Sequence, residues 1–149
     1  MDYEGVIIEE SLEDRGILKD IKTISTKVEP ITAEHKTPWL KQWTLHTVSI
    51  PANDADQVAG IISKSLGDNY WYADYKNEKT HFIIFPNKVF KIDRTKVEEY
   101  KAATEFGLKL GIPDYQLDFA PNVVQWERPK KTSLAQKIAG QAKYLNQTL

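Results

Sequence analysis

The chain is 149 residues long, which suits one domain that buries roughly two thirds of its unfolded surface. Hydrophobic residues make up 41% of the sequence and charged residues 28%, a balance typical of globular proteins rather than of disordered or membrane proteins. There is no cysteine, so disulfides, thiolate catalysis and cysteine-ligated metal sites are excluded.

Net charge and hydropathy limit which cellular compartment and which binding partners we expect. The formal net charge of −1 argues against a surface devoted to nucleic acid. Residues 82–85 form the longest apolar run, far shorter than the roughly 20 residues of a membrane-spanning helix. The N-terminus begins acidic and lacks the basic and apolar regions of a secretory signal. We therefore expect a cytoplasmic protein with no membrane partner.

The first part of the chain predicts a strand, a short helix and two further strands. Residues 6–8 are a short apolar strand. Ser11 offers a helix N-cap oxygen, so a short helix is expected over residues 11–21. Apolar and polar residues then alternate over residues 22–31 and again over residues 39–50, which is the period of half-buried strands.

Two longer helices are predicted further along. Residues 54–66 carry apolar side chains at helical spacing, and Gly67 stands where a left-handed C-terminal cap is expected. Residues 95–110 repeat this pattern after Asp93, which is a candidate N-cap. Gly111 is expected to end this second helix in the same way.

Between these helices, residues 69–92 contain seven of the sixteen aromatic residues in the chain. They predict a meander of three antiparallel strands. The first turn is expected at Asn77 and Glu78. The second is expected at Pro86 and Asn87, because proline suits the second position of a turn and asparagine tolerates the third.

The order of elements predicts the fold class. The first six follow the order β-α-β-β-α-β of a ferredoxin-like split βαβ sandwich. We predict an α+β fold of this kind, extended by the antiparallel meander and by a third helix. Residues 1–120 are expected to form one domain. Residues 121–149 are expected to form a basic linker and a C-terminal helix that packs on this domain or on a partner subunit.

The first turn of the meander decides whether an Asp-His pair forms. A two-residue turn at Asn77 and Glu78 places Asp74 opposite His81, with Cβ atoms about 5 Å apart. A three-residue turn places Asp74 opposite Phe82 and removes the pair. Such a pair could orient a general base or raise the pKa of the histidine. The alternative is a polar cross-strand pair on a solvated sheet face.

His46 is the third candidate for chemistry. It lies in the strand predicted over residues 39–50 and would approach His81 if that strand paired beside the meander. Both imidazoles with Asp74 or Glu9 would then suffice for a divalent metal. No characteristic metal-ligand spacing accompanies them, so we expect neither a metal nor another cofactor. The acids around Glu9 are expected to be a solvated helix start.

Residues 121–149 differ electrostatically from the rest. They carry five basic residues against one acidic residue, a balance of +4 that leaves −5 for residues 1–120. Opposite charges favour docking of this tail on its own body or on a second subunit, and the alternatives are contact with RNA, an acidic partner or a membrane surface. The candidate partner-binding residues are Arg128, Lys130, Lys131 and Lys137.

Aromatic side chains supply candidate ligand contacts. Alternation places aromatic residues on both faces of the strand around residue 72, so one face is either a second buried layer or an exposed platform. An exposed platform could stack bases as RNA-recognition folds do, but the negative body opposes phosphate, and nucleic acid is not an expected partner. The candidate ligand-binding residues are Tyr70, Tyr72, Trp43 and Trp71.

Glycine-rich phosphate loops and nucleophile-elbow motifs are absent from the sequence. Our first hypothesis is therefore a small cytosolic module that binds a partner chain, its own copy as a dimer, or a small ligand through an aromatic-rich sheet. The first alternative is a hydrolase or isomerase, with or without a metal, built on Asp74, His81 and His46 with Tyr72 or Glu10. The second alternative is nucleic-acid binding through the basic tail.

Overall fold

The computed structural model describes residues 1–31, 40, 42–67, 71–117 and 119. The chain divides into two compact units, one of residues 1–29 and 43–99 and the other of residues 30–42 and 100–149. The first unit holds nearly all of the sheet and the residues on which the sites depend. The domain boundary expected after residue 120 and the tail helix lie outside the described residues.

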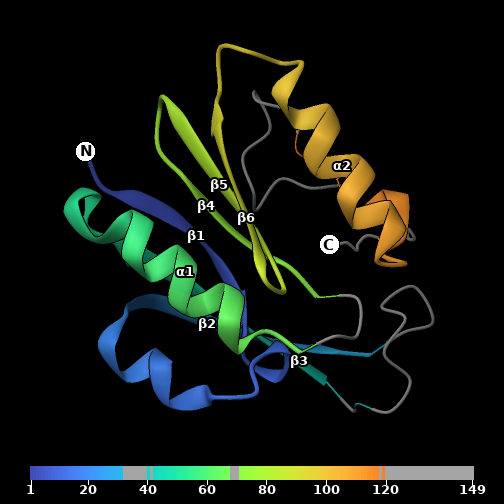
Figure 1. Ribbon diagram of the computed structural model, residues 1–149. Helices are drawn as coiled ribbons and strands as arrows, with labels where there is room; N and C mark the ends of the chain where they lie inside the picture. Colours follow the sequence, from blue (N-terminus) through green and yellow to red (C-terminus); the bar gives the residue numbers. More distant parts are fainter. Residues whose placement is uncertain (32–39, 41, 68–70, 118, 120–149) are drawn as a thin grey trace. The chain divides into compact units, whose positions relative to one another are not determined.

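One antiparallel sheet runs through the first unit. Its spatial order is β2-β3-β1-β4-β5-β6 (Figure 1). Strand β1 therefore lies between β3 and β4, with Ile7 opposite His46 and Val6 opposite Asp74. Among the described residues the six strands are β1 (Tyr3–Ile8), β2 (Lys22–Pro30), β3 (Gln42–Ile50), β4 (Ala73–Lys76), β5 (Thr80–Phe85) and β6 (Lys88–Asp93).

The helix expected between the first two strands is not an α-helix. This segment contains two 3₁₀ helices, η1 (Glu9–Ser11) and η2 (Arg15–Asp20). The Asp14 carboxylate accepts the Gly16 N–H at 2.9 Å, and such a local side-chain bond competes with α-helical pairing. Gly16 lowers helix propensity further. Ser11 does not cap this segment; its hydroxyl donates to the Ile8 carbonyl.

Helix α1 (Ala55–Ser65) lies against one face of the sheet (Figure 1). The Tyr75 hydroxyl donates to the Ala55 carbonyl at 2.5 Å, and the Ser63 hydroxyl donates to the Phe85 carbonyl at 2.6 Å. Gly67 is not in the left-handed conformation that we expected. The helix ends instead because Leu66 is extended, with φ −73° and ψ 137°, and forms a β-bridge with Leu12. A further 3₁₀ helix, η4 (Ala52–Asp54), precedes α1.

Helix α2 (Glu99–Lys109), apart from its first residue, and the 3₁₀ helix η5 (Asp114–Gln116) belong to the second unit. The helix begins four residues later than the sequence pattern predicts. Asp93 uses its carboxylate to accept the N–H and hydroxyl of Thr95 in a local turn, so it does not cap the helix. Gly111 has φ 92°, which confirms the left-handed residue expected after this helix.

The two turns of the meander differ in how well the sequence predicts them. Phe85 lies opposite Lys88, which confirms the turn at Pro86 and Asn87, and Asn87 has φ 60°. The first turn is at Glu78 and Lys79 rather than at Asn77 and Glu78. Asn77 instead lies beside the turn, where its N–H bonds the Thr80 carbonyl at 3.0 Å and its side-chain oxygen accepts the Thr80 N–H at 2.8 Å.

Strand β2 is more exposed than its alternating pattern suggests. It was expected to be half-buried, but eight of its nine residues are exposed and the other, Glu29, is intermediate. The strand lies at the edge of the sheet, and an alternating pattern alone does not say whether either face of a strand is covered. Ile24 and Val28 keep 51% and 53% of their surface exposed.

Candidate functional site

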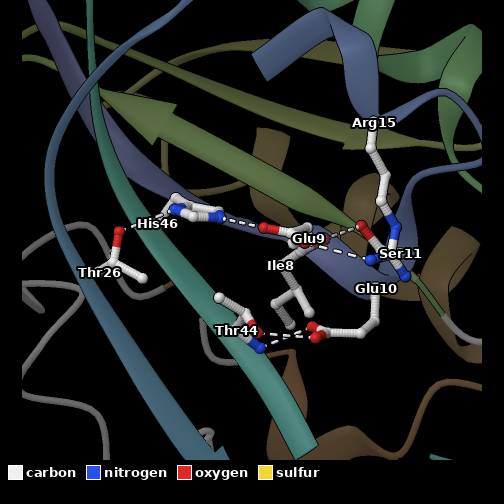
Figure 2. Close-up of polar contacts among 8 residues, drawn as sticks. All are labelled: Ile8, Glu9, Glu10, Ser11, Arg15, Thr26, Thr44 and His46. Atoms are coloured by element: carbon white, nitrogen blue, oxygen red, sulfur yellow. Dashed lines mark hydrogen bonds and ion pairs between the residues drawn. The ribbon is translucent and has the colours of Figure 1, made fainter. Parts of the chain in front are cut away.

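A network of polar contacts joins a 3₁₀ helix and two strands near the end of β1 (Figure 2). His46 Nε2 lies 2.8 Å from Glu9 Oε1, and His46 Nδ1 lies 2.9 Å from the Thr26 hydroxyl oxygen. Antiparallel pairing of Ile7 with His46 places the residue two positions later, Glu9, within reach of the imidazole. These contacts therefore connect η1, β3 and the edge strand β2.

The partners of His46 determine which nitrogen carries the proton. A carboxylate only accepts hydrogen bonds, so Nε2 must donate to Glu9. In the neutral imidazole Nδ1 is then an acceptor, and the Thr26 hydroxyl donates its proton to it. Thr26 is thus hydrogen-bonded to a base whose other nitrogen is oriented by a carboxylate.

Arg15 forms an ion pair with the second carboxylate oxygen of Glu9. Its guanidinium lies 3.1 Å from Glu9 Oε2, so the two oxygens of Glu9 face different partners. The side chain of His46 is 14% exposed, that of Glu9 31% and that of Arg15 53%. Side-chain exposure therefore increases from His46 through Glu9 to Arg15, and solvent reaches all three side chains.

The neighbouring Glu10 serves a separate purpose. Its two carboxylate oxygens accept the Thr44 N–H at 2.6 Å and the Thr44 hydroxyl at 2.7 Å. This contact ties η1 to β3 without involving an imidazole (Figure 2). Glu9 and Glu10 therefore begin a short helix, as expected, but they also accept hydrogen bonds from β3 and are not simply solvated.

The Asp-His pair of the meander is present, in a different register from the one expected. Asp74 lies opposite Ile83 and His81 opposite Lys76, so Asp74 and His81 are diagonal neighbours on one sheet face. His81 Nε2 lies 2.7 Å from Asp74 Oδ2. Each residue is 1% exposed, which contradicts the expected solvated face. The pair is a buried polar contact in the first unit.

The three candidate catalytic residues do not form one site. Strands β1 and β4 separate β3 from β5. Ile7 pairs with His46 whereas its neighbour Val6 pairs with Asp74, so the two histidines point to opposite faces. The metal site that would combine both imidazoles is thereby ruled out by geometry. Within the described part of the chain, no group of three or more histidine, aspartate or glutamate residues is placed to hold a metal ion.

The aromatic candidates are largely covered. Trp43 and Trp71 are each 5% exposed, and their ring centroids are 5.5 Å apart. Tyr72 is half-buried, with its ring 5.9 Å from that of Phe85. Tyr70 lies outside the described residues. The other aromatic side chains of β4 and β5, which are Tyr75, Phe82 and Phe85, are fully buried.

The basic candidates Arg128, Lys130, Lys131 and Lys137 lie outside the described residues, so their role stays a prediction. No helix in the described ranges is both long and apolar enough to cross a membrane. Comparison with protein-family models, with curated proteins and with solved structures finds no match.

Two members of the polar network were missed by sequence reasoning. Thr26 is one of several Thr and Ser residues in an alternating strand. Arg15 is a single basic residue in a short polar segment. Neither position differs locally from a solvated surface residue. The signal is tertiary, because Thr26 and Glu9 are 20 and 37 residues away from His46 and meet it only through strand pairing.

Proposed function

We propose that the chain is a small cytosolic interaction module that binds a second copy of itself through the outer edge of β2. The observation that carries this proposal is the exposure of Lys22–Pro30 at the end of the sheet order. The outer edge of an edge strand presents backbone N–H and C=O groups that can template another strand. The absence of cysteine suits the reducing cytosol.

The sequence of β2 supports pairing about a twofold axis at Thr26. In an antiparallel pair centred there, Ile24 of each copy lies opposite Val28 of the other, on the same sheet face. These are the two large apolar residues that β2 exposes. Their pairing would bury four side chains beside new main-chain hydrogen bonds and would join two sheets into one.

The fold itself supports a finer proposal. The order β2-β3-β1-β4 places β3 between β1 and β2, and β1 between β3 and β4. This interleaving is what two split βαβ units produce. Helix α1 connects β3 to β4, and η2 stands in the connection where the first helix of such a sandwich would be. We infer a ferredoxin-like core extended by β5 and β6.

The other hypotheses receive less support from the described residues. Ligand binding through Trp43 and Trp71 requires ring surface that is 95% covered, since each residue is 5% exposed. Catalysis by Asp74 and His81 requires access to side chains that are 2% exposed. Nucleic-acid binding by the basic tail predicts affinity that falls steeply with salt, and it concerns residues beyond those described.

Analytical ultracentrifugation over a range of protein concentrations tests the edge-strand proposal. We expect the wild-type chain to form a dimer that dissociates on dilution. The double variant Ile24→Lys with Val28→Lys should be monomeric, because like charges would face each other across the twofold axis. Ile61→Lys is the matched control, since Ile61 is 43% exposed on α1 and its replacement should leave the dimer unchanged. A monomeric wild-type chain, or a double variant that still dimerises, would contradict the proposal.

A further inference from the structure

The contacts of Thr26, His46 and Glu9 have the hydrogen-bond polarity of a nucleophile, a general base and an orienting carboxylate. With a neutral imidazole, the hydroxyl donates to one ring nitrogen at 2.9 Å, and the other nitrogen donates to the carboxylate at 2.8 Å. Hydroxyl nucleophiles are activated in this way on unrelated folds, and geometry rather than sequence order identifies such sites. We propose that these three residues form an acyl-transfer site that hydrolyses carboxylic esters.

Arg15 acts on this site as a positioning residue. Its guanidinium occupies Glu9 Oε2 and leaves Oε1 for the imidazole. The negative charge on Glu9 favours the imidazolium that forms when His46 takes the hydroxyl proton. Arg15 restrains that carboxylate without touching either the hydroxyl or the imidazole.

The Thr26 hydroxyl is accessible to a substrate. Thr26 belongs to the exposed part of β2, whereas the imidazole behind it is mostly covered. The buried His81 lacks this access because its side chain is 2% exposed, although it contacts a carboxylate in the same way.

The reaction divides into two balanced steps. Thr26 Oγ attacks the ester carbonyl carbon while its proton passes to His46 Nδ1, and the C–O bond to the alcohol breaks as that proton passes to the leaving alkoxide. The product is an acyl ester of Thr26 and a free alcohol. Water then attacks the acyl carbon, gives a proton to His46 and releases the carboxylic acid, and the proton returns to Thr26 Oγ. No oxidant, metal or further reactant is required.

Hydrolysis of p-nitrophenyl acetate by the full chain tests this site. We expect release of p-nitrophenolate above the buffer rate, with Thr26→Val lowering the protein-dependent rate by about 100-fold and Thr26→Ser retaining it. Thr23→Val is the matched control, because it makes the same change on the opposite face of β2 and should leave the rate unchanged. Peptide mapping after rapid acid quenching should find acetyl on Thr26 in the wild-type chain.

Three results would overturn the proposal. They are a wild-type rate equal to that of buffer, equal rates in wild type and Thr26→Val, and acetyl found on lysines but never on Thr26. Because Thr26 is exposed, its replacement should leave the fold intact, and thermal unfolding of each variant verifies this. The assay measures acyl transfer and not association, so its failure would leave the dimer proposal standing.

Discussion

Two histidines make nearly the same contact at the residue scale and differ in accessibility. His46 lies 2.8 Å from a glutamate and His81 lies 2.7 Å from an aspartate. Their side chains are 14% and 2% exposed respectively. A buried pair is expensive to break, whereas a partly exposed pair remains available for chemistry. We therefore assign His81 to stability and His46 to the proposed site.

Asp74→Ala should lower the free energy of unfolding by about 3 kcal/mol, because it leaves the buried imidazole of His81 without its carboxylate partner. Asp56→Ala is the matched control. Asp56 forms an ion pair with Lys91 at 3.1 Å, but both side chains are more than half exposed, so its loss should cost less than about 1 kcal/mol. Chemical denaturation measures both values, and equal losses would contradict the assignment.

Tyr75 should make stability fall in alkali. Burial, and to a lesser extent the negative charge of Asp56, raises the pKa of Tyr75 above its ordinary value. The unfolded chain ionises this hydroxyl above about pH 10 while the folded chain keeps it protonated, so the folded state loses its advantage as pH rises. In Tyr75→Phe this contribution is absent. The stability difference between wild type and variant should therefore shrink above about pH 10, and parallel pH curves would contradict the claim.

At the scale of elements, the meander shows why a wrong turn can still give a correct pair. The expected turn and the observed turn are displaced by one residue, which slides the register by two. Because side chains alternate with period two, a slide of two keeps Asp74 and His81 on the same face. Alternation could therefore predict that the two residues meet. It could not predict their burial, since that depends on what covers the sheet.

The pairing of β1 with β4 depends on a close approach at Gly5. A Cβ atom added at Gly5 would lie 1.9 Å from the Asp74 carbonyl oxygen and 2.5 Å from Tyr75 Cα. Gly5→Ala should therefore force the strands apart and lower the free energy of unfolding by about 3 kcal/mol. Gly60→Ala, in α1 with nothing within 4 Å of the added atom, should raise it by about 0.5 kcal/mol. Thermal unfolding compares the two, and changes of the same sign would contradict this account.

At the scale of the whole molecule, local sequence patterns predicted where the strands lie in the sequence better than which strands are neighbours and which are buried. The strand order and the exposure of β2 depend on long-range pairing, which alternation does not encode. The same limitation hid the meeting of Glu9, Thr26 and His46, which come from η1, β2 and β3. An α+β class and a β-meander follow from sequence, whereas the edge position of β2 and the polar contacts beside it emerge only from the assembled sheet.

Charge complementation across the β2 edge tests the central claim of self-association most directly. Ile24→Lys with Val28→Lys should abolish the dimer. Ile24→Lys with Val28→Glu should restore it, because each introduced lysine would face a glutamate of the other copy in the register centred on Thr26. We predict a monomer for the first variant and a dimer for the second by analytical ultracentrifugation at matched concentrations. Two variants with the same oligomeric state would contradict the account.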